Sequence, residues 1–178
     1  MTPTQAGRAS SSRPNISIVI REPNWRENLA LVRVVRRAAQ LAAHTPTAGN
    51  VQRIDTPAAS VLLSSDKHVQ ELNRAFRRKN KPTNVLAFPA VPEAVPYLGD
   101  VALAYGVVRQ EASVQGKSLS AHAAHLTIHG ILHLLGYDHH ASNDAKIMEN
   151  QEILLLARLG IANPYERVPV RSRKFRNK

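Results

Sequence analysis

The sequence lacks cysteine altogether over its 178 residues. This absence excludes disulfides, thiolate metal ligands and a thiol nucleophile. Any metal bound by this chain must therefore be held by imidazole, carboxylate or backbone oxygen atoms. A chain that needs no disulfide is compatible with a reducing compartment, and we expect a cytoplasmic protein.

Long apolar runs and aromatic residues are also scarce. No apolar stretch approaches the ~20 residues that a membrane-spanning helix requires, and the first residues lack the apolar segment typical of a secretory signal. We therefore expect no membrane association. Phe, Trp and Tyr together make up only 4% of the residues, which argues against a broad base-stacking surface. We expect Phe76 and Phe88 to lie in the core.

Acidic residues are too few to balance the basic ones, since 24 Lys and Arg face 13 Asp and Glu, for a formal net charge of +11. Such an excess attracts polyanions, among which nucleic acid is the most common partner. A basic composition without a specific partner is the alternative. The charge is densest in what we call the basic cluster, which consists of Arg74, Arg77, Arg78, Lys79 and Lys81. Because guanidinium groups bind phosphate oxygens bidentately, the cluster predicts a phosphate-binding surface, with a solvated loop as the alternative.

The chain divides into three segments by composition. Residues 1–14 are rich in Ser, Thr, Pro and Ala and contain no acid, which predicts a disordered tail; a short transit peptide is a second interpretation. Residues 15–166 are predicted to form a single domain, because no linker interrupts them. Residues 167–178 carry six basic residues and no acid, and they predict a basic tail that can contact phosphates.

Strand-like and helix-like segments alternate between the two tails. Strands are predicted, from β-branched and apolar content, over residues 16–20, 58–64, 85–88 and 99–105. Helices are predicted, from apolar periodicity, over residues 25–43, 66–76, 106–115, 118–135 and 144–159. Asn24 and Asp66 are predicted to cap the first two helices.

Six of the eight histidines fall within residues 122–140. His129 and His133 are four residues apart in an apolar helical segment, so both imidazoles lie on one helix face. Gly136 can adopt the left-handed conformation that ends a helix and reverses the chain. A reversal at Gly136 brings His139 toward the same point, which predicts one metal ion bound by His129, His133 and His139.

Three neutral imidazoles around Zn²⁺ leave a fourth coordination position open, as in catalytic zinc sites. The ion lowers the pKa of a bound water to ~7 and so supplies a nucleophile at neutral pH. Hydrogen-bonded histidines without a metal are the alternative. His125, one turn before His129, is interpreted as a residue that supports the site or packs at its mouth rather than as a ligand. Asp138 is either a partner of a ligand imidazole or a turn residue.

Four blocks of sequence resemble one known family. HGILHLLGYDH at residues 129–139 is similar to the signature of the YbeY family, bacterial and organellar endoribonucleases that act in ribosomal RNA maturation. LNRAFRRKNKPTNVLAFP at residues 72–89 is similar to the family block L-N-x-x-[FY]-R-x-K-[DN]-K-P-T-[DN]-V-L-S-F-P. The L-G-D of residues 98–100 resembles the opening of the strand before the motif helix. The fourth block combines Met-Glu at residues 148–149 with LGIANPY at residues 159–165.

The resemblance implies a zincin-like α+β fold, in which a small mixed sheet packs with helices and a long central helix carries the metal site. It implies one zinc ion on His129, His133 and His139, and it implies catalytic roles for Arg77 and His129. The implied activity is single-strand-specific, metal-dependent RNA cleavage in ribosomal RNA maturation, at the 3′ end of 16S rRNA, and in ribosome quality control. The implied partners are precursor ribosomal RNA and the ribosome or its small subunit, with the basic cluster binding RNA.

Two departures from the family pattern flank the proposed site. Arg78 replaces the usual glycine and adds charge, and Ala87 replaces the usual serine and removes a hydroxyl. Two other functions are weighed. A metallopeptidase or other small-substrate metallohydrolase is disfavoured because Gly130 stands where H-E-x-x-H proteases carry their general base. A non-catalytic, ribosome-associated RNA-binding protein with a structural zinc is the other alternative.

Overall fold

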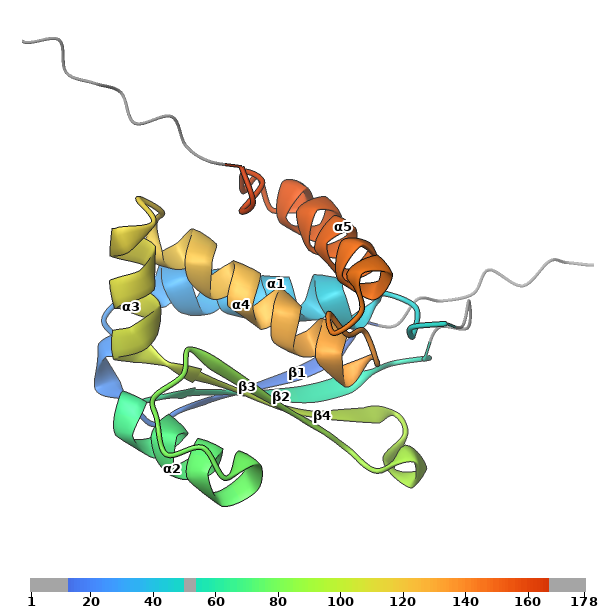
Figure 1. Cartoon of the computed structure of the whole chain (residues 1–178), viewed down its shortest axis with the longest axis horizontal. Helices are drawn as coiled ribbons and strands as arrows, with labels where there is room; N and C mark the ends of the chain where they lie inside the picture. Colours follow the sequence, from blue (N-terminus) through green and yellow to red (C-terminus); the bar gives the residue numbers. More distant parts are fainter. Residues whose placement is uncertain (1–12, 50–53, 167–178) are drawn as a thin grey trace, which may run out of the picture.

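The computed structural model describes residues 13–49 and 54–166 of the chain (Figure 1). Apart from residues 13 and 14, the two predicted tails lie outside these described residues. Within the described ranges, no helix combines the length and the apolar character needed to cross a membrane.

Four strands form one mixed sheet in the order β1-β2-β4-β3. They are β1 (Asn15–Ile20), β2 (Ala58–Ser64), β3 (Val85–Pro89) and β4 (Tyr97–Ala104). The first three in spatial order are parallel, whereas β3 pairs antiparallel with β4 and forms one edge of the sheet. The central strands carry fully buried β-branched residues such as Val61 and Val101, as expected for strands covered on both faces.

Helices cover both faces of this sheet and make the fold α+β, as predicted. The five α-helices are α1 (Leu29–Ala43), α2 (Asp66–Arg77), α3 (Tyr105–Val114), α4 (Leu119–Leu134) and α5 (Ser142–Arg158). Helices α1 and α4 lie side by side over one face, and α2 lies on the other (Figure 1). Helix α5 packs on α4 and α1. Two short 3₁₀ helices, η1 (Pro23–Trp25) and η2 (Pro92–Ala94), lie in connecting segments.

Helix α4 is the central helix of the larger core. Its residues Ile128, Ile131 and Leu132 are completely buried. Gly130 allows the close approach of α4 to the sheet, because a Cβ atom at this position would lie only 2.7 Å from Cγ1 of Val101 on β4. Glycine at position 130 therefore lets the part of α4 that carries His129 and His133 pack closely on β4. Any larger residue at this position would force α4 or Val101 to shift.

The first helix begins later than predicted. Asn28, not Asn24, is its N-cap, and the Asn28 side chain accepts a hydrogen bond from the Leu31 N–H at 3.0 Å. Trp25 lies instead in η1, fully buried, and its indole N–H donates to the Ser64 carbonyl at 3.1 Å. Burial of the large indole fixes the chain before the helix, so the cap moves to the next asparagine.

The predicted cap at Asp66 was also wrong. Ser65 caps α2 by accepting from the His68 N–H, and Asp66 is the first helical residue. Its carboxylate accepts from the N–H groups of Gly106 and Val107 at 2.8 and 3.1 Å, so it caps the start of α3. An acidic side chain at a helix N-terminus stabilises that helix irrespective of which element supplies it.

The expectation that both phenylalanines lie in the core is wrong for Phe76. Its side chain lies in the last turn of α2 and the residue is 68% exposed. Phe88 on β3 is partly buried beside the smaller apolar cluster under α2. The remaining predicted elements agree with the structure to within two residues at each end.

Candidate metal centre

The C-terminal end of α4 brings the three predicted metal ligands together. Gly136 has a φ angle of +87°, and the N–H of Tyr137 donates back to the Leu132 carbonyl at 3.0 Å. The chain therefore reverses as the sequence predicts. Ring nitrogens of His129, His133 and His139 lie within 4.8 Å of one another, so the structure places these side chains where one ion can contact all three.

The hydrogen bonds of two of these rings define which nitrogen faces the shared point. Nδ1 of His129 lies 2.7 Å from Oε1 of Glu152, and Nδ1 of His133 lies 2.9 Å from the Tyr137 carbonyl oxygen. Carboxylate and carbonyl oxygens only accept, so each Nδ1 carries a proton and donates it. In a neutral ring, the Nε2 atom then keeps its lone pair.

The two Nε2 atoms face each other across 3.1 Å. Two lone pairs at this distance repel unless a cation lies between them. Zn–N bonds of ~2.0–2.1 Å in tetrahedral geometry separate two ligand nitrogens by about 3.3 Å. Burial lowers the pKa of His133, and the nearby His129 lowers it further, against the raising effect of the Tyr137 carbonyl. The Nε2 atoms of His129 and His133 are thus oriented and spaced for a divalent metal ion, and a ring nitrogen of His139 lies close enough to contact the same ion.

Glu152 on α5 is a residue of the site that sequence reasoning missed. Its side chain is 1% exposed and joins two histidines, with Oε1 on His129 at 2.7 Å and Oε2 on Nε2 of His125 at 2.8 Å. The Tyr165 hydroxyl also donates to Oε2. Burial alone raises the pKa of this carboxyl, but the hydrogen bonds from His125, His129 and Tyr165 outweigh it and lower the pKa to about 2. The sequence does carry a signal for this burial. Glu152 lies four residues after Met148 and four before Leu156, so all three lie on the same, buried face of α5.

The two residues with open interpretations are now placed. His125 touches the carboxylate that holds His129, so it supports the site, in agreement with its interpretation as a non-ligand. Asp138 is exposed and accepts a hydrogen bond from the His139 N–H at 2.7 Å, which is the role of a turn residue.

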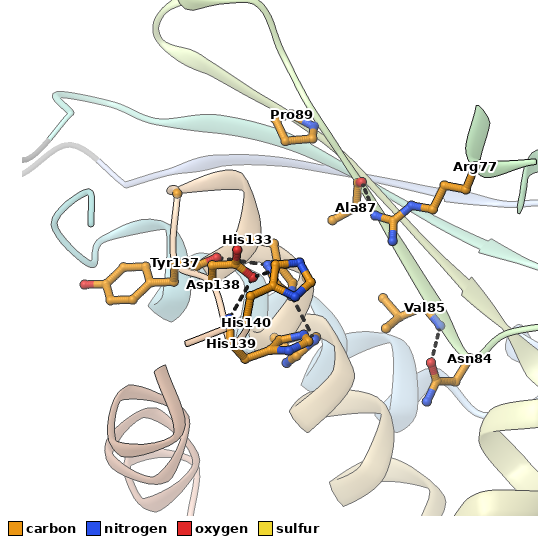
Figure 2. Close-up of a pocket in the computed structure, with 13 residues that line it drawn as sticks. Arg77, Asn84, Val85, Ala87, Pro89, His133, Tyr137, Asp138, His139 and His140 are labelled. Carbon is orange, nitrogen blue, oxygen red and sulfur yellow. Dashed lines mark hydrogen bonds and ion pairs between the residues drawn. The ribbon is translucent and has the colours of Figure 1, made fainter. Parts of the chain in front are cut away.

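A pocket of about 480 Å³ opens beside the histidines. Its walls include His133 and His139 on one side, and Ala87 and Pro89 of the edge strand β3 on the other (Figure 2). Arg77, from the end of α2, reaches the pocket at this edge, and its Nη2 donates to the Ala87 carbonyl at 3.2 Å. Ala87 is buried and lacks a hydroxyl, so the guanidinium meets only the strand backbone here.

Of the basic cluster, Arg77 alone lines this pocket. Arg74, Arg78, Lys79 and Lys81 do not line it and are exposed on α2 and the loop that follows α2. Arg78 is the C-cap of α2 and has a φ angle of +56°, the left-handed conformation that glycine adopts most easily. The site therefore combines three histidines that could hold one metal ion with one arginine at the pocket wall.

The family model described as endoribonuclease YbeY matches residues 23–160. The chain belongs to the YbeY family. It is 44% identical over 168 residues to the endoribonuclease YbeY of Rhodopseudomonas palustris, which covers 90% of this chain and 85% of that one. It is 41% identical over 156 residues to the endoribonuclease YbeY of Gluconobacter oxydans, which covers 87% of this chain and 90% of the other.

One solved structure with the same fold is the solution structure of TM1509 from Thermotoga maritima. It matches with a TM-score of 0.52 and 22% identity, covering 88% of this chain and 99% of that one. At that identity, the likeness supports the fold alone. The YbeY membership predicted from the four sequence blocks is confirmed by the family model and the two relatives.

Proposed function

We propose that this chain is a zinc-dependent, single-strand-specific endoribonuclease that acts in ribosomal RNA maturation at the 3′ end of 16S rRNA and in ribosome quality control. The observation that carries the proposal is the convergence of His129, His133 and His139 beside a pocket walled by Arg77. Precursor ribosomal RNA and the ribosome or its small subunit are the proposed partners, and the cytoplasm is the proposed location. The names of the YbeY relatives support RNA as the substrate.

The roles of the side chains follow from their positions. His129, His133 and His139 are the proposed metal ligands, and Zn²⁺ bound there would supply a Lewis acid for a phosphate oxygen or a water molecule. The guanidinium of Arg77 holds the phosphate at the pocket wall and offsets the charge that develops on its oxygens. Glu152 fixes the tautomer and direction of the His129 ring.

The rest of the basic cluster is proposed to bind the RNA backbone. Arg74, Arg78, Lys79 and Lys81 are exposed next to Arg77 and can pair with phosphates flanking the scissile one. We also propose that residues 15–166 act as one domain and that the basic residues of 167–178 add phosphate contacts.

The experiment that tests this proposal compares the wild-type chain with His133→Ala on a defined ribosomal RNA. We expect the substitution to abolish metal binding and cleavage, whereas RNA binding stays and remains sensitive to salt, because the basic cluster is untouched. Elemental analysis of protein purified without an affinity tag identifies the metal. Equal cleavage by both proteins would contradict the proposal and point to a contaminating nuclease, whereas chelator-sensitive cleavage of casein would favour the peptidase alternative.

A further inference from the structure

The most exposed Phe, Tyr or Trp residue in the described part of the chain lies within the sequence of the basic cluster. Phe76 is 68% exposed, although it directly precedes Arg77, the arginine of the metal pocket. A phenylalanine that stays in water forgoes the free energy that burial of its ring would supply. The fold does not use its ring to fill the core.

The ring of Phe76 is nevertheless held in a fixed position. It meets the ring of Phe88 edge to face, with centroids 5.2 Å apart and an interplanar angle of 65°. Phe88 is itself anchored beside the apolar cluster under α2. An edge-to-face contact of this kind favours one ring orientation while part of the ring surface remains open to solvent. Phe76 is therefore a pre-positioned aromatic surface rather than a loose side chain.

The loop that carries the lysines is also fastened to α2. Asn73 is 3% exposed, its side-chain amide donates to the Lys81 carbonyl at 2.9 Å, and its backbone carbonyl accepts from the Lys79 N–H at 3.2 Å. The cations that follow Phe76 are thus presented by an ordered turn. An exposed ring followed along the chain by ordered cations has the two features that bind single-stranded nucleic acid: a face for a base and charges for the backbone.

Phe76 and the metal centre lie on opposite sides of the edge strand β3. Val85, Ala87 and Pro89 line the metal pocket, whereas Phe88 lies with the cluster under α2 on the other face. Arg77 spans the edge between them, since it leaves α2 and donates to the Ala87 carbonyl. A strand of RNA whose phosphate is held at Arg77 therefore has the histidines on one side and the Phe76 ring on the other.

A carboxylate on the Phe88 face of the sheet supports the same orientation. Asp100 on β4 is the cross-strand neighbour of Phe88, and its carboxylate accepts a hydrogen bond from the Tyr97 hydroxyl at 2.7 Å. A carboxylate on this side repels phosphate, so the RNA backbone is favoured on the arginine side and the base over the ring.

We propose that Phe76, supported by Phe88, is a stacking site for one unpaired base of single-stranded RNA next to the nucleotide held at the metal centre. The proposal rests on the proposed function, because it assumes that the strand crosses Arg77. It explains a preference for unpaired RNA, since a base inside a duplex cannot present its face to the ring.

The test uses the full chain loaded with zinc and a single-stranded 2′-O-methyl oligoribonucleotide that carries one 2-aminopurine. We expect Phe76→Ala to bind this probe about 5- to 150-fold more weakly than wild type, the range for loss of one base–aromatic stack. The quenching of 2-aminopurine by stacking should disappear. The slope of log affinity against log salt should stay unchanged, because no charge is removed. Phe76→Trp should keep both the affinity and the quenching.

Two further variants distinguish base stacking on the ring from a general apolar contact with RNA. Phe76→Leu keeps an apolar contact with Phe88 but has no ring face, so it should behave like Phe76→Ala. Leu154→Ala removes another exposed apolar side chain, 59% exposed on α5, and should bind like wild type. Wild-type affinity and quenching in Phe76→Ala or in Phe76→Leu would overturn the proposal.

Failure of the stacking proposal can be distinguished from failure of the proposed nuclease function. Binding and quenching are read from probe that gel electrophoresis shows to be intact, so they do not depend on cleavage. If wild type fails to cleave ribosomal RNA but quenches the probe through Phe76, the stacking site stands and the nuclease proposal falls. If wild type cleaves and Phe76→Ala matches it in binding, quenching and KM, the stacking site alone falls.

Discussion

The carboxylate of Glu152 on α5 accepts a hydrogen bond from Nδ1 of His129 on α4 at 2.7 Å. This contact is the link between the helix that carries two of the proposed ligands and the helix that covers it. A buried carboxylate that accepts from the outer nitrogen of a ligand imidazole fixes the ring and raises the basicity of its other nitrogen. Its second oxygen is occupied by His125, so the carboxylate cannot rotate away without losing another hydrogen bond.

Glu152→Gln should weaken zinc binding about 10- to 100-fold, the usual cost of removing a partner of a metal-bound histidine. The amide keeps the shape of the side chain but replaces one of the two accepting oxygens by a donor. Competition with a chromophoric zinc chelator measures the affinity. Glu149→Gln, on an exposed position of the same helix, is the matched control. Identical zinc affinities in both variants would show that Glu152 only fills space.

Arg77→Ala should lower kcat for RNA cleavage by about 100- to 1000-fold, the effect of losing one preorganised charge donor at a transition state. Zinc content and melting temperature should stay at wild-type values, because Arg77 is exposed and contacts no proposed ligand. Arg33→Ala is the control, since it removes the same charge from an exposed position on α1, outside both the pocket and the basic cluster. Equal cleavage by the two variants would remove Arg77 from the mechanism.

Gly130→Ala should destabilise the fold although alanine favours helices. The propensity gain in a helix interior is about 1 kcal/mol. The Cβ atom that alanine adds at position 130 would, however, lie 2.7 Å from Cγ1 and 3.0 Å from Cγ2 of Val101. Overpacking of this kind costs about 1–3 kcal/mol. Urea denaturation of the metal-loaded protein measures the difference.

A second substitution tests whether contact with Val101 causes the destabilisation by Gly130→Ala. Val101→Ala in the Gly130→Ala background opens the space that the new methyl group needs, so the two changes should be non-additive, with the double variant more stable than the sum predicts. A stabilising effect of Gly130→Ala alone would mean that α4 can move away from β4.

The parts of the site that are local in sequence could be predicted, and those that depend on packing could not. The spacing of His129, His133, Gly136 and His139 specifies one helix face and one turn, so their convergence follows from helix geometry alone. Glu152 lies 23 residues from His129, and only the packing of α5 on α4 brings them together. Its charge is tolerated in the core because both oxygens are paired, which a sequence cannot reveal.

The errors in the predicted helix caps also arise from tertiary packing. Asn24 and Asn28 are equally good caps by residue type, and burial of Trp25 decides between them. Asp66 was expected to cap its own helix but caps α3, some 40 residues later. The strands were predictable because short, largely apolar runs such as Ala58–Ser64 have the length of a strand and are too short for a typical helix.

His122 should make the stability of the fold depend on pH. It is 3% exposed, and burial lowers its pKa from 6.5, opposed by its hydrogen bond to Glu111 at 2.8 Å. Its Nδ1 is buried without a hydrogen-bond partner in the described structure, so a proton there would be unpaired. The unfolded chain therefore binds this proton more readily than the folded chain.

The sign of the effect follows from proton linkage. Stability contributed by neutral His122 is complete above the unfolded pKa of 6.5 and is lost as the pH falls below it toward the lower folded pKa. His122→Gln should flatten this decline. Urea denaturation at a series of pH values in excess chelator measures it without a contribution from metal release. His68→Gln, which removes a partly exposed histidine from α2, is the control. A decline as steep in His122→Gln as in wild type would assign the acid sensitivity to other groups.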